Sequence, residues 1–417
     1  MRHLILGNGP AGVVAAETLR KHSPADSVTL LGDEPGPPYS RMAIPYLLMG
    51  DIEEPGTWLR KDPRHFDRLG IDLKTGRAAS VDAAKREVRL ASGETLAWDR
   101  LLVATGSRPN RPPVPGIELP GVYPCWTLPD ARAIASRARK GSRVLQMGAG
   151  FIGCIILEAL AARGAELVVV EMGDRMVPRM MPPRASELIH AWCERQGIRV
   201  ITGARVAEIR EAGGQLAVGL TDGQSFTVDL VISATGVTPN ADFLEGSGIA
   251  CDQGVLVDER METSVKGVFA AGDVSRAPEF DTDRRIAYAI QPTAVEQARV
   301  AALNMLGRET ASPGALAMNV LDTLGLVSAS FGQWHGVPHA QGGAWVEQRD
   351  EERFRYLRLE FKDDRLIGAT SVGLTEHVGV IRGLIQGRVS LGEWKQRLLA
   401  DPTRLMEAYL ARAQAAS

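Results

Sequence analysis

The sequence predicts an α/β protein in which two β-α-β units precede an α+β C-terminal domain. Two internal repeats carry this prediction. An apolar stretch followed at once by a glycine-rich turn occurs near the N-terminus and again in the middle of the chain, and an apolar stretch ending in Ala-Thr-Gly also occurs twice. With 417 residues the chain is long enough for about two or three domains.

The first glycine-rich turn lies between a predicted strand and a predicted helix. Residues 3–6 form a short, mainly apolar run, and a helical pattern and a second apolar run at 28–31 follow the turn. The turn reads Gly7-Asn8-Gly9-Pro10-Ala11-Gly12. In this context the pattern predicts a dinucleotide site. Gly7 and Gly9 let the backbone approach a pyrophosphate, Gly12 lets the helix pack closely, and the helix N-terminus offers free N–H groups.

The same arrangement recurs in the middle of the chain. A predicted strand at 143–147 leads into Gly148-Ala149-Gly150-Phe151-Ile152-Gly153. A helix is expected over 154–163, and the next strand, 167–170, ends at Glu171. Two complete units indicate two bound dinucleotides. The alternative is that one unit is a structural relic that no longer binds.

An acidic side chain after the second strand of such a unit binds ribose hydroxyls. The candidates in the first unit are Asp33 and Glu34, each of which is otherwise an ordinary polar turn residue. In the second unit, Glu171 would accept hydrogen bonds from the ribose of NAD and repel the 2′-phosphate of NADP. The sequence therefore favours NAD, and Arg175 is the residue that would favour NADP.

Further apolar strands end in small residues. The two repeats of this kind are Ala104-Thr105-Gly106 and Ala234-Thr235-Gly236, each soon followed by a proline, and we expect the chain to cross between domains there. A third apolar strand ends in Gly272-Asp273, and a helix is predicted from Gln291 to about Leu306. The C-terminal segment alternates strands and then predicts helices near 374–386 and 391–414.

Composition excludes several other classes of protein. The chain has 48 basic and 50 acidic side chains, so no global positive field favours nucleic acid. No apolar run reaches the ~18 residues of a membrane span, and the N-terminus lacks a signal-peptide layout. The four cysteines and seven histidines follow no metal-site or disulfide spacing, which indicates no metal and a reduced, cytoplasmic environment. Cys154 is expected to be a packing residue rather than a redox sensor.

These motifs together resemble the FAD-dependent pyridine nucleotide–disulfide oxidoreductase superfamily. Pro38-Tyr39-Ser40-Arg41 and the segment through Gly50 are similar to its rubredoxin/ferredoxin reductase and nitrite reductase flavoprotein branch. The resemblance implies two Rossmann-like domains and a C-terminal α+β interface domain. Their expected bounds are 1–112 with 241–312 for FAD, 113–240 for NAD, and 313–417 for the interface domain.

The motifs and the resemblance together give the residues expected at the two cofactor sites. Those for FAD are Gly7, Gly9, Pro10, Ala11, Gly12, Asp33, Glu34, Arg41, Ala104, Thr105, Gly106, Gly272, Asp273, Gln291 and Pro292. Those for NAD(H) are Gly148, Gly150, Phe151, Ile152, Gly153, Glu171 and Gly236. The resemblance implies that Asp273 contacts the ribityl–phosphate region of FAD. The helix from Gln291 would direct its positive end at the isoalloxazine.

The sequence departs from the family where the disulfide chemistry takes place. Met42 aligns with the reactive cysteine of single-cysteine members, and a thioether cannot form a thiolate. Tyr46 stands where ferredoxin reductases usually carry lysine, and together with Pro45 it is a candidate for the flavin face. Ile155 replaces a glutamate that the family places beside the nicotinamide.

The predicted reaction is hydride transfer from NADH to FAD without a catalytic side chain. Electrons then pass to a small redox protein such as a ferredoxin, rubredoxin or cytochrome. Two alternatives stay open at this point. One is an NADH oxidase or a reductase of quinones or other small molecules, and the other is a flavoprotein subunit or redox-responsive binding module. The resemblance also implies that the protein forms a homodimer through its C-terminal domain.

Overall fold

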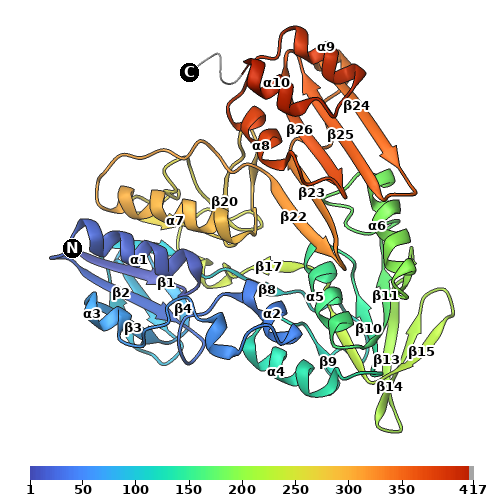
Figure 1. Ribbon diagram of the computed structural model, residues 1–417. Coiled ribbons are helices and arrows are strands. Elements are labelled where there is room, and N and C mark those ends of the chain that lie inside the picture. Colours follow the sequence, from blue (N-terminus) through green and yellow to red (C-terminus); the bar gives the residue numbers. More distant parts are fainter. Residues whose placement is uncertain (413–417) are drawn as a thin grey trace. The chain divides into compact units, whose positions relative to one another are not determined.

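The computed structural model describes residues 1–412, and Figure 1 shows the arrangement of their helices and strands. The chain divides into two compact units. The first consists of Met1–Pro109 and Val237–Ala315, and the second of Asn110–Gly236 and the chain from Leu316 onward. Each unit is therefore assembled from two separate stretches of sequence. The division into three domains stays a prediction.

The first unit is built on a five-stranded parallel sheet in the order β19-β7-β1-β2-β3. The strands are β1 (Arg2–Leu6), β2 (Ser27–Gly32), β3 (Ile71–Thr75), β7 (Arg100–Val103) and β19 (Val268–Ala270). The apolar residues of the three central strands are buried, as is expected of parallel strands covered on both faces. Helices α1 (Pro10–His22) and α7 (Gln291–Met305) pack side by side.

Smaller elements complete the first unit. They are the helices α2 (Ile44–Met49) and α3 (His65–Arg68), the antiparallel sheet of β4 (Ala78–Asp82), β5 (Glu87–Leu90) and β6 (Thr95–Ala97), the pair β8 (Ser107–Pro109) and β17 (Val237–Pro239), and the sheet of β18 (Val255–Leu256), β20 (Ser275–Pro278) and β21 (Arg285–Ile286). Strands β8 and β17 pair antiparallel, so the two ends of the inserted segment Asn110–Gly236 leave the first unit as neighbours.

The second unit repeats the parallel sheet in the order β12-β11-β10-β16-β9. The strands are β9 (Val122–Tyr123), β10 (Arg143–Met147), β11 (Glu166–Glu171), β12 (Arg199–Thr202) and β16 (Leu230–Ser233). Helices α4 (Leu128–Arg137), α5 (Phe151–Ala162) and α6 (Pro183–Arg195) accompany them, as does an antiparallel sheet of β13 (Val206–Ala212), β14 (Gln215–Leu220) and β15 (Ser225–Val228). The predicted α/β class with two Rossmann-like units is confirmed.

The C-terminal segment adds a five-stranded antiparallel sheet in the order β22-β23-β26-β25-β24. The strands are β22 (Met318–Thr323), β23 (Leu326–Gly332), β24 (Gly343–Asp350), β25 (Arg355–Lys362) and β26 (Arg365–Val372), and the helices are α8 (Val378–Gln386), α9 (Glu393–Ala400) and α10 (Leu405–Arg412). The single helix expected over 391–414 is wrong. Pro402 cannot continue a helix, so the chain ends α9 at Ala400 and starts α10 at Leu405.

Helix α6 joins the inserted segment to this C-terminal sheet within the second unit. The indole Nε1 of Trp192 donates to the carbonyl of Leu324 at 3.2 Å, and its ring packs edge-on against Phe354. Arg349, at the end of β24, pairs with Glu187 at 3.1 Å. Within residues 1–412, every helix is too short or too polar to cross a lipid bilayer.

Candidate functional site

The first glycine turn closes tightly on its own sheet and opens on one side. Gly7 has φ +109°, and a Cβ there would lie 2.1 Å from the carbonyl oxygen of Ala104. A Cβ on Gly12 would lie 1.8 Å from the Gly7 oxygen, whereas one on Gly9 would meet nothing within 4 Å. Helix α1 begins directly after Gly9 without a side-chain cap. Gly9 therefore faces open space beside free N–H groups, as a cradle for phosphates requires.

The second glycine turn has the same construction. A Cβ on Gly148 would lie 2.4 Å from the carbonyl oxygen of Ala234, and one on Gly153 would lie 2.5 Å from the Gly148 oxygen. The space at Gly150 is open, and α5 begins after it without a side-chain cap. The Ala-Thr-Gly repeat thus has a structural role, because each of its alanines packs its carbonyl against the first glycine of a turn.

The two units differ at the end of their second strand. The register aligns Arg2 with Ser27 in the first unit and Arg143 with Glu166 in the second, so Gly32 holds the place of Glu171. The side chain of Asn8 fills the space there, because a Cβ on Gly32 would lie 2.1 Å from the Asn8 Nδ2. The first unit therefore has no carboxylate at the position where the second unit carries one.

The two acids predicted for the first unit lie just beyond this strand. Asp33 is exposed, whereas Glu34 is held by two neighbours. Its Oε1 pairs with Arg41 Nη2 at 2.5 Å and its Oε2 accepts from the Tyr39 hydroxyl at 2.7 Å. Arg41 also donates to that hydroxyl at 2.9 Å. Of the two acids, only Glu34 is thus fixed in place, and its contact with Tyr39 was not predicted from the sequence.

Glu171 is 8% exposed and is oriented by backbone N–H groups. Its Oε2 accepts from Ala149 N at 2.7 Å and its Oε1 from Gly173 N at 2.8 Å. Each carboxylate oxygen has a second lone pair, which remains for a ribose hydroxyl. Arg175 instead bonds to Asp174 at 2.8 Å, so the basic residue that would favour NADP is paired with a neighbouring acid.

Gly272 and Asp273 follow strand β19, and Thr105 follows the neighbouring parallel strand β7. Asp273 therefore lies at the same end of the sheet as Thr105. Its Oδ2 accepts from the Ser107 hydroxyl at 2.9 Å. Burial raises the pKa of Asp273, while the bond to Ser107 and the charge of Arg41 act in the opposite direction. The Asp273 carboxylate keeps free lone pairs for the hydroxyls of a ribityl chain.

Helix α7 begins at Gln291, with Pro292 in its first turn and without a side-chain cap. The Gln291 Oε1 accepts from the Ser40 hydroxyl at 2.6 Å, which ties this N-terminus to the Tyr39–Arg41 segment. The positive end of α7 is therefore held beside residues that the sequence predicted for FAD.

Met42 and Tyr46 lie on one face of a short helical stretch. Their side chains are 58% and 53% exposed, whereas Ile44 and Leu48 between and beyond them are buried. Pro45 is half-buried. Met42 and Tyr46 thus form an exposed, mainly apolar face.

The cysteines offer no reactive thiolate near the predicted sites. Burial raises the pKa of Cys125 and of Cys193 to about 12 and raises that of Cys154 further. Only Cys251 is exposed. Among residues 1–412 no group of histidine, cysteine or acidic side chains is arranged to hold a metal ion. Cys154 is thus a buried packing residue rather than a thiolate-based redox sensor.

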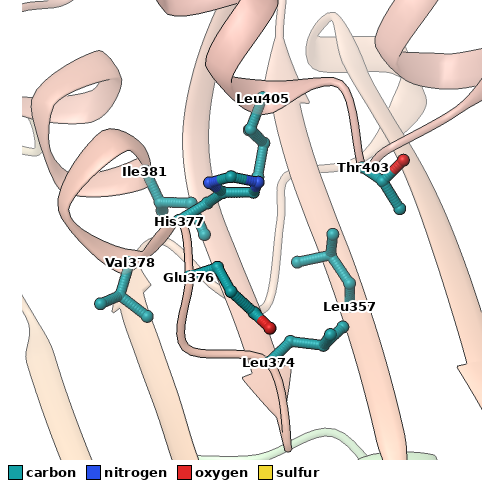
Figure 2. Close-up of a pocket in the computed structure, with 8 residues that line it drawn as sticks. All are labelled: Leu357, Leu374, Glu376, His377, Val378, Ile381, Thr403 and Leu405. Atoms are coloured by element: carbon teal, nitrogen blue, oxygen red, sulfur yellow. The ribbon is translucent and has the colours of Figure 1, made fainter.

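A cavity of about 300 Å³ lies in the C-terminal segment and is separate from these residues. Figure 2 shows His377 among the side chains that line this cavity, most of which are apolar. The lining residues are Leu357, Leu374, Glu376, His377, Val378, Ile381, Thr403 and Leu405. None of them belongs to either predicted cofactor site.

Two uncapped helix N-termini, each behind a glycine turn with an open middle position, define a protein that binds two dinucleotides. Residues 1–302 match the family described as pyridine nucleotide-disulphide oxidoreductase, and the chain belongs to that family. It is an oxidoreductase that uses FAD and NAD(H).

Relatives match the chain almost from end to end. The NADH-dependent phenylglyoxylate dehydrogenase subunit epsilon of Aromatoleum evansii is 31% identical and covers 96% of this chain and 95% of its own. The biphenyl dioxygenase system ferredoxin–NAD(+) reductase component of Paraburkholderia xenovorans is 30% identical, with 93% of each chain covered. The fold also matches the covalent putidaredoxin reductase–putidaredoxin complex, with a TM-score of 0.90, 23% identity and 98% of each chain covered.

Proposed function

We propose that the chain takes a hydride from NADH and passes the electrons to a separate one-electron redox protein. The observation that carries this proposal is the pair of glycine turns, since each unit has its own open cradle at a helix N-terminus. Bound FAD supplies the chemistry, because it accepts two electrons as a hydride and releases them singly. The protein binds and orients the cofactors and tunes their electrostatic environment.

The first unit would hold FAD. Gly9 leaves room for the pyrophosphate, Glu34 is fixed by Arg41 and Tyr39, and Asp273 offers acceptors to the ribityl hydroxyls. The N-terminus of α7 brings a positive dipole to the same set of residues. This end of the helix would stabilise negative charge on the reduced isoalloxazine.

The second unit would hold NAD(H). Gly150 leaves room for the pyrophosphate, and Glu171 presents a buried carboxylate to the adenosine ribose. A 2′-phosphate there would place a dianion against a carboxylate that is already oriented. We therefore assign NADH rather than NADPH as the electron donor.

The electron acceptor is proposed from Met42 and from the relatives. Met42 cannot form a thiolate, so a disulfide has no first nucleophile at this position. Named relatives are reductases of ferredoxin-type proteins. The exposed face of Met42 and Tyr46 offers the small apolar surface of a transient redox encounter.

Anaerobic reduction by NADH followed by mixing with separate acceptors tests this proposal. Fast reoxidation by a [2Fe–2S] ferredoxin, with slow reoxidation by oxygen, is the expected result. Efficient turnover with coenzyme A disulfide or glutathione disulfide would contradict it, as would uptake of four electrons per flavin. Fast, complete turnover with oxygen alone would favour an NADH oxidase.

A second candidate function has support from the first relative. That protein is named as a subunit of an NADH-dependent dehydrogenase and matches nearly the whole chain. In this case the chain would pass electrons to partner subunits rather than to a diffusing carrier. Isolation of the native protein from its own cells decides, because a stable complex with other polypeptides supports the subunit and a free chain supports the reductase.

A homodimer in the cytoplasm completes the proposal. Members of the family dimerise through their C-terminal domain, and here β24 and β22 expose Trp345 and Val320. The cytoplasm supplies NADH and small redox carriers. A monomeric mass by light scattering at micromolar concentration would reject the dimer, and recovery of the protein in a membrane or periplasmic fraction would reject the compartment.

A further inference from the structure

Gln146 is a polar residue in the middle of the apolar strand β10, directly below the second glycine turn. It is fully buried, with 0% exposure. Its side-chain Nε2 donates to the carbonyl of Gly148 at 2.9 Å and to the carbonyl of Gly153 at 3.0 Å. One amide group thus joins the first and the last glycine of the turn.

The first unit closes its turn without such a side chain. Ile5 stands at the position of Gln146, since β1 and β10 align residue by residue from Arg2 and Arg143. There a Cβ on Gly12 would lie 1.8 Å from the Gly7 oxygen, compared with 2.5 Å for Gly153 and the Gly148 oxygen. The first turn is therefore closed by backbone packing, whereas the second is wider and is closed by an amide bridge.

Glu171 holds the other side of the peptide group that joins Gly148 to Ala149. The Gly148 carbonyl and the Ala149 N–H belong to one peptide, and they point in opposite directions. Gln146 binds the carbonyl, while the Glu171 Oε2 accepts from the N–H at 2.7 Å. This peptide cannot flip without losing both bonds, and Glu171 takes its orientation from it.

The amide is retained although its other end is unsatisfied. Among the described residues, Gln146 Oε1 is buried and has no hydrogen-bond partner. A buried carbonyl without a donor lowers stability. An apolar side chain like Ile5 would remove this cost at Oε1, but it would leave the Gly148 and Gly153 carbonyls without their N–H donor. Both bonds of the Gln146 amide go to carbonyls at the two ends of the turn, so the residue acts on the turn rather than on the sheet.

We propose that Gln146 is a positioning residue for the adenosine half of NAD(H). It locks the 148–149 peptide, and through that peptide it sets both the phosphate-facing turn and the carboxylate that faces the ribose. A site that is already in its bound form binds more tightly, because less ordering accompanies binding. The inference rests on the proposed role of the second unit as the NAD(H) site.

Replacement of Gln146 by methionine tests the proposal, because methionine keeps the length of the side chain and removes the N–H donors. Gln196→Met, an exposed change in the same unit, is the matched control. Calorimetry with ADP-ribose on the FAD-loaded protein should show roughly tenfold weaker binding for Gln146→Met, because the turn and the Glu171 carboxylate are no longer held in their bound form before the ligand arrives. The preference for NADH over NADPH should narrow.

Two further measurements separate positioning from a general structural role. The melting temperature of Gln146→Met should change little, because the unsatisfied Oε1 leaves with the amide while the Gly148 and Gly153 carbonyls lose its N–H donors. Flavin reduction by dihydronicotinamide mononucleotide, which lacks the adenosine half, should keep its wild-type rate. If Gln146→Met does not fold, Gln146→Ile, with the residue of the first unit, takes its place.

Each other outcome has a defined meaning. Unchanged affinity for ADP-ribose overturns the inference, and so does a parallel loss of melting temperature, ADP-ribose binding and reduction by the mononucleotide. Wild-type protein that binds neither ADP-ribose nor NADH refutes the proposed function itself. Tight wild-type binding that Gln146→Met leaves intact refutes only the role of Gln146.

Discussion

Gly32 and Glu171 occupy the same place in two equivalent strands, and only the second has a side chain there. In the first unit the amide of Asn8 crosses over Gly32, whereas in the second the carboxylate of Glu171 turns back to the Ala149 N–H. The two nucleotide sites are therefore built on one plan with different ribose contacts. This difference makes their cofactor preferences separately testable.

Replacing Glu171 by alanine should weaken NADH binding by roughly 10- to 100-fold, since hydrogen bonds to a charged group are lost. The affinity for NADPH should fall less than that for NADH, so the preference for NADH should narrow or invert. The rate and midpoint of flavin bleaching by each nucleotide measure this. Glu166→Ala, at the exposed start of the same strand, serves as the control. A wild-type preference for NADPH would make Arg175 the determinant instead.

Gly9→Ala and Gly12→Ala should have opposite consequences. The methyl group on Gly12 would meet the Gly7 oxygen at 1.8 Å, so this variant should fail to fold or lose several kcal/mol, about what a severe core clash costs. The methyl group on Gly9 meets nothing within 4 Å, so this variant should fold. It should nevertheless purify with little FAD, because the methyl group occupies the phosphate cradle. Equal FAD content in wild type and Gly9→Ala would argue against that cradle.

Substitution of Met42 should affect electron transfer to the carrier protein but not flavin reduction by NADH. Met42→Lys places a charge on the exposed face, and we expect a higher KM for ferredoxin with an unchanged rate of anaerobic reduction by NADH. Met406→Lys on α10 is a matched change at another exposed methionine. A slower NADH half-reaction in Met42→Lys would show that Met42 acts on the flavin rather than on docking.

Asp273 should make the FAD-free protein less stable at neutral pH. Its pKa is raised by burial, so the folded protein binds a proton more tightly than the unfolded chain does. Stability therefore falls as pH rises from the ordinary value of ~3.9 through the raised one, and it stays lower above both. Asp273→Asn should raise the melting temperature of the FAD-free protein at neutral pH and flatten this dependence, while weakening FAD binding. Asp67→Asn, exposed in α3, should change neither property.

One thiol per chain should react quickly with a thiol reagent in the native protein. Cys251 is exposed, while Cys125, Cys154 and Cys193 are buried with raised pKa values. The other three should react only after denaturation. Cys251→Ser should abolish the fast phase. A fast phase that remains in Cys251→Ser would indicate that the protein opens locally around one of the three buried cysteines.

Local sequence patterns predicted the two glycine turns and the strands around them, because a turn that must approach a phosphate leaves little choice of residue. The pairing of Gly7 with Ala104 was also implicit in the repeated Ala-Thr-Gly. The contacts of Tyr39 and Arg41 with Glu34 could not be predicted, since they depend on the path of the loop between these residues. Pro402 was a readable signal for the break between α9 and α10. Gln146 was readable too, as a polar residue inside an apolar strand.

Long-range contacts lay beyond sequence reasoning. Trp192 gave no sign that its indole would bind the carbonyl of Leu324, which is 132 residues away. Only the fold brings α6 to the C-terminal sheet. The position of the Asn8 side chain over Gly32 could not be predicted either, because it is recognised only when β2 and β11 are aligned by their register.

The order of strands in the first sheet has a consequence for synthesis of the chain. Strand β7 ends at Val103, and its neighbour β19 begins only at Val268. Until β19 leaves the ribosome, one edge of the buried sheet has unpaired N–H and C=O groups, and such edges recruit other chains. A truncated product that ends before Val268 should therefore aggregate or be degraded. In the nascent chain this edge stays unpaired for as long as the ribosome takes to make the whole insertion.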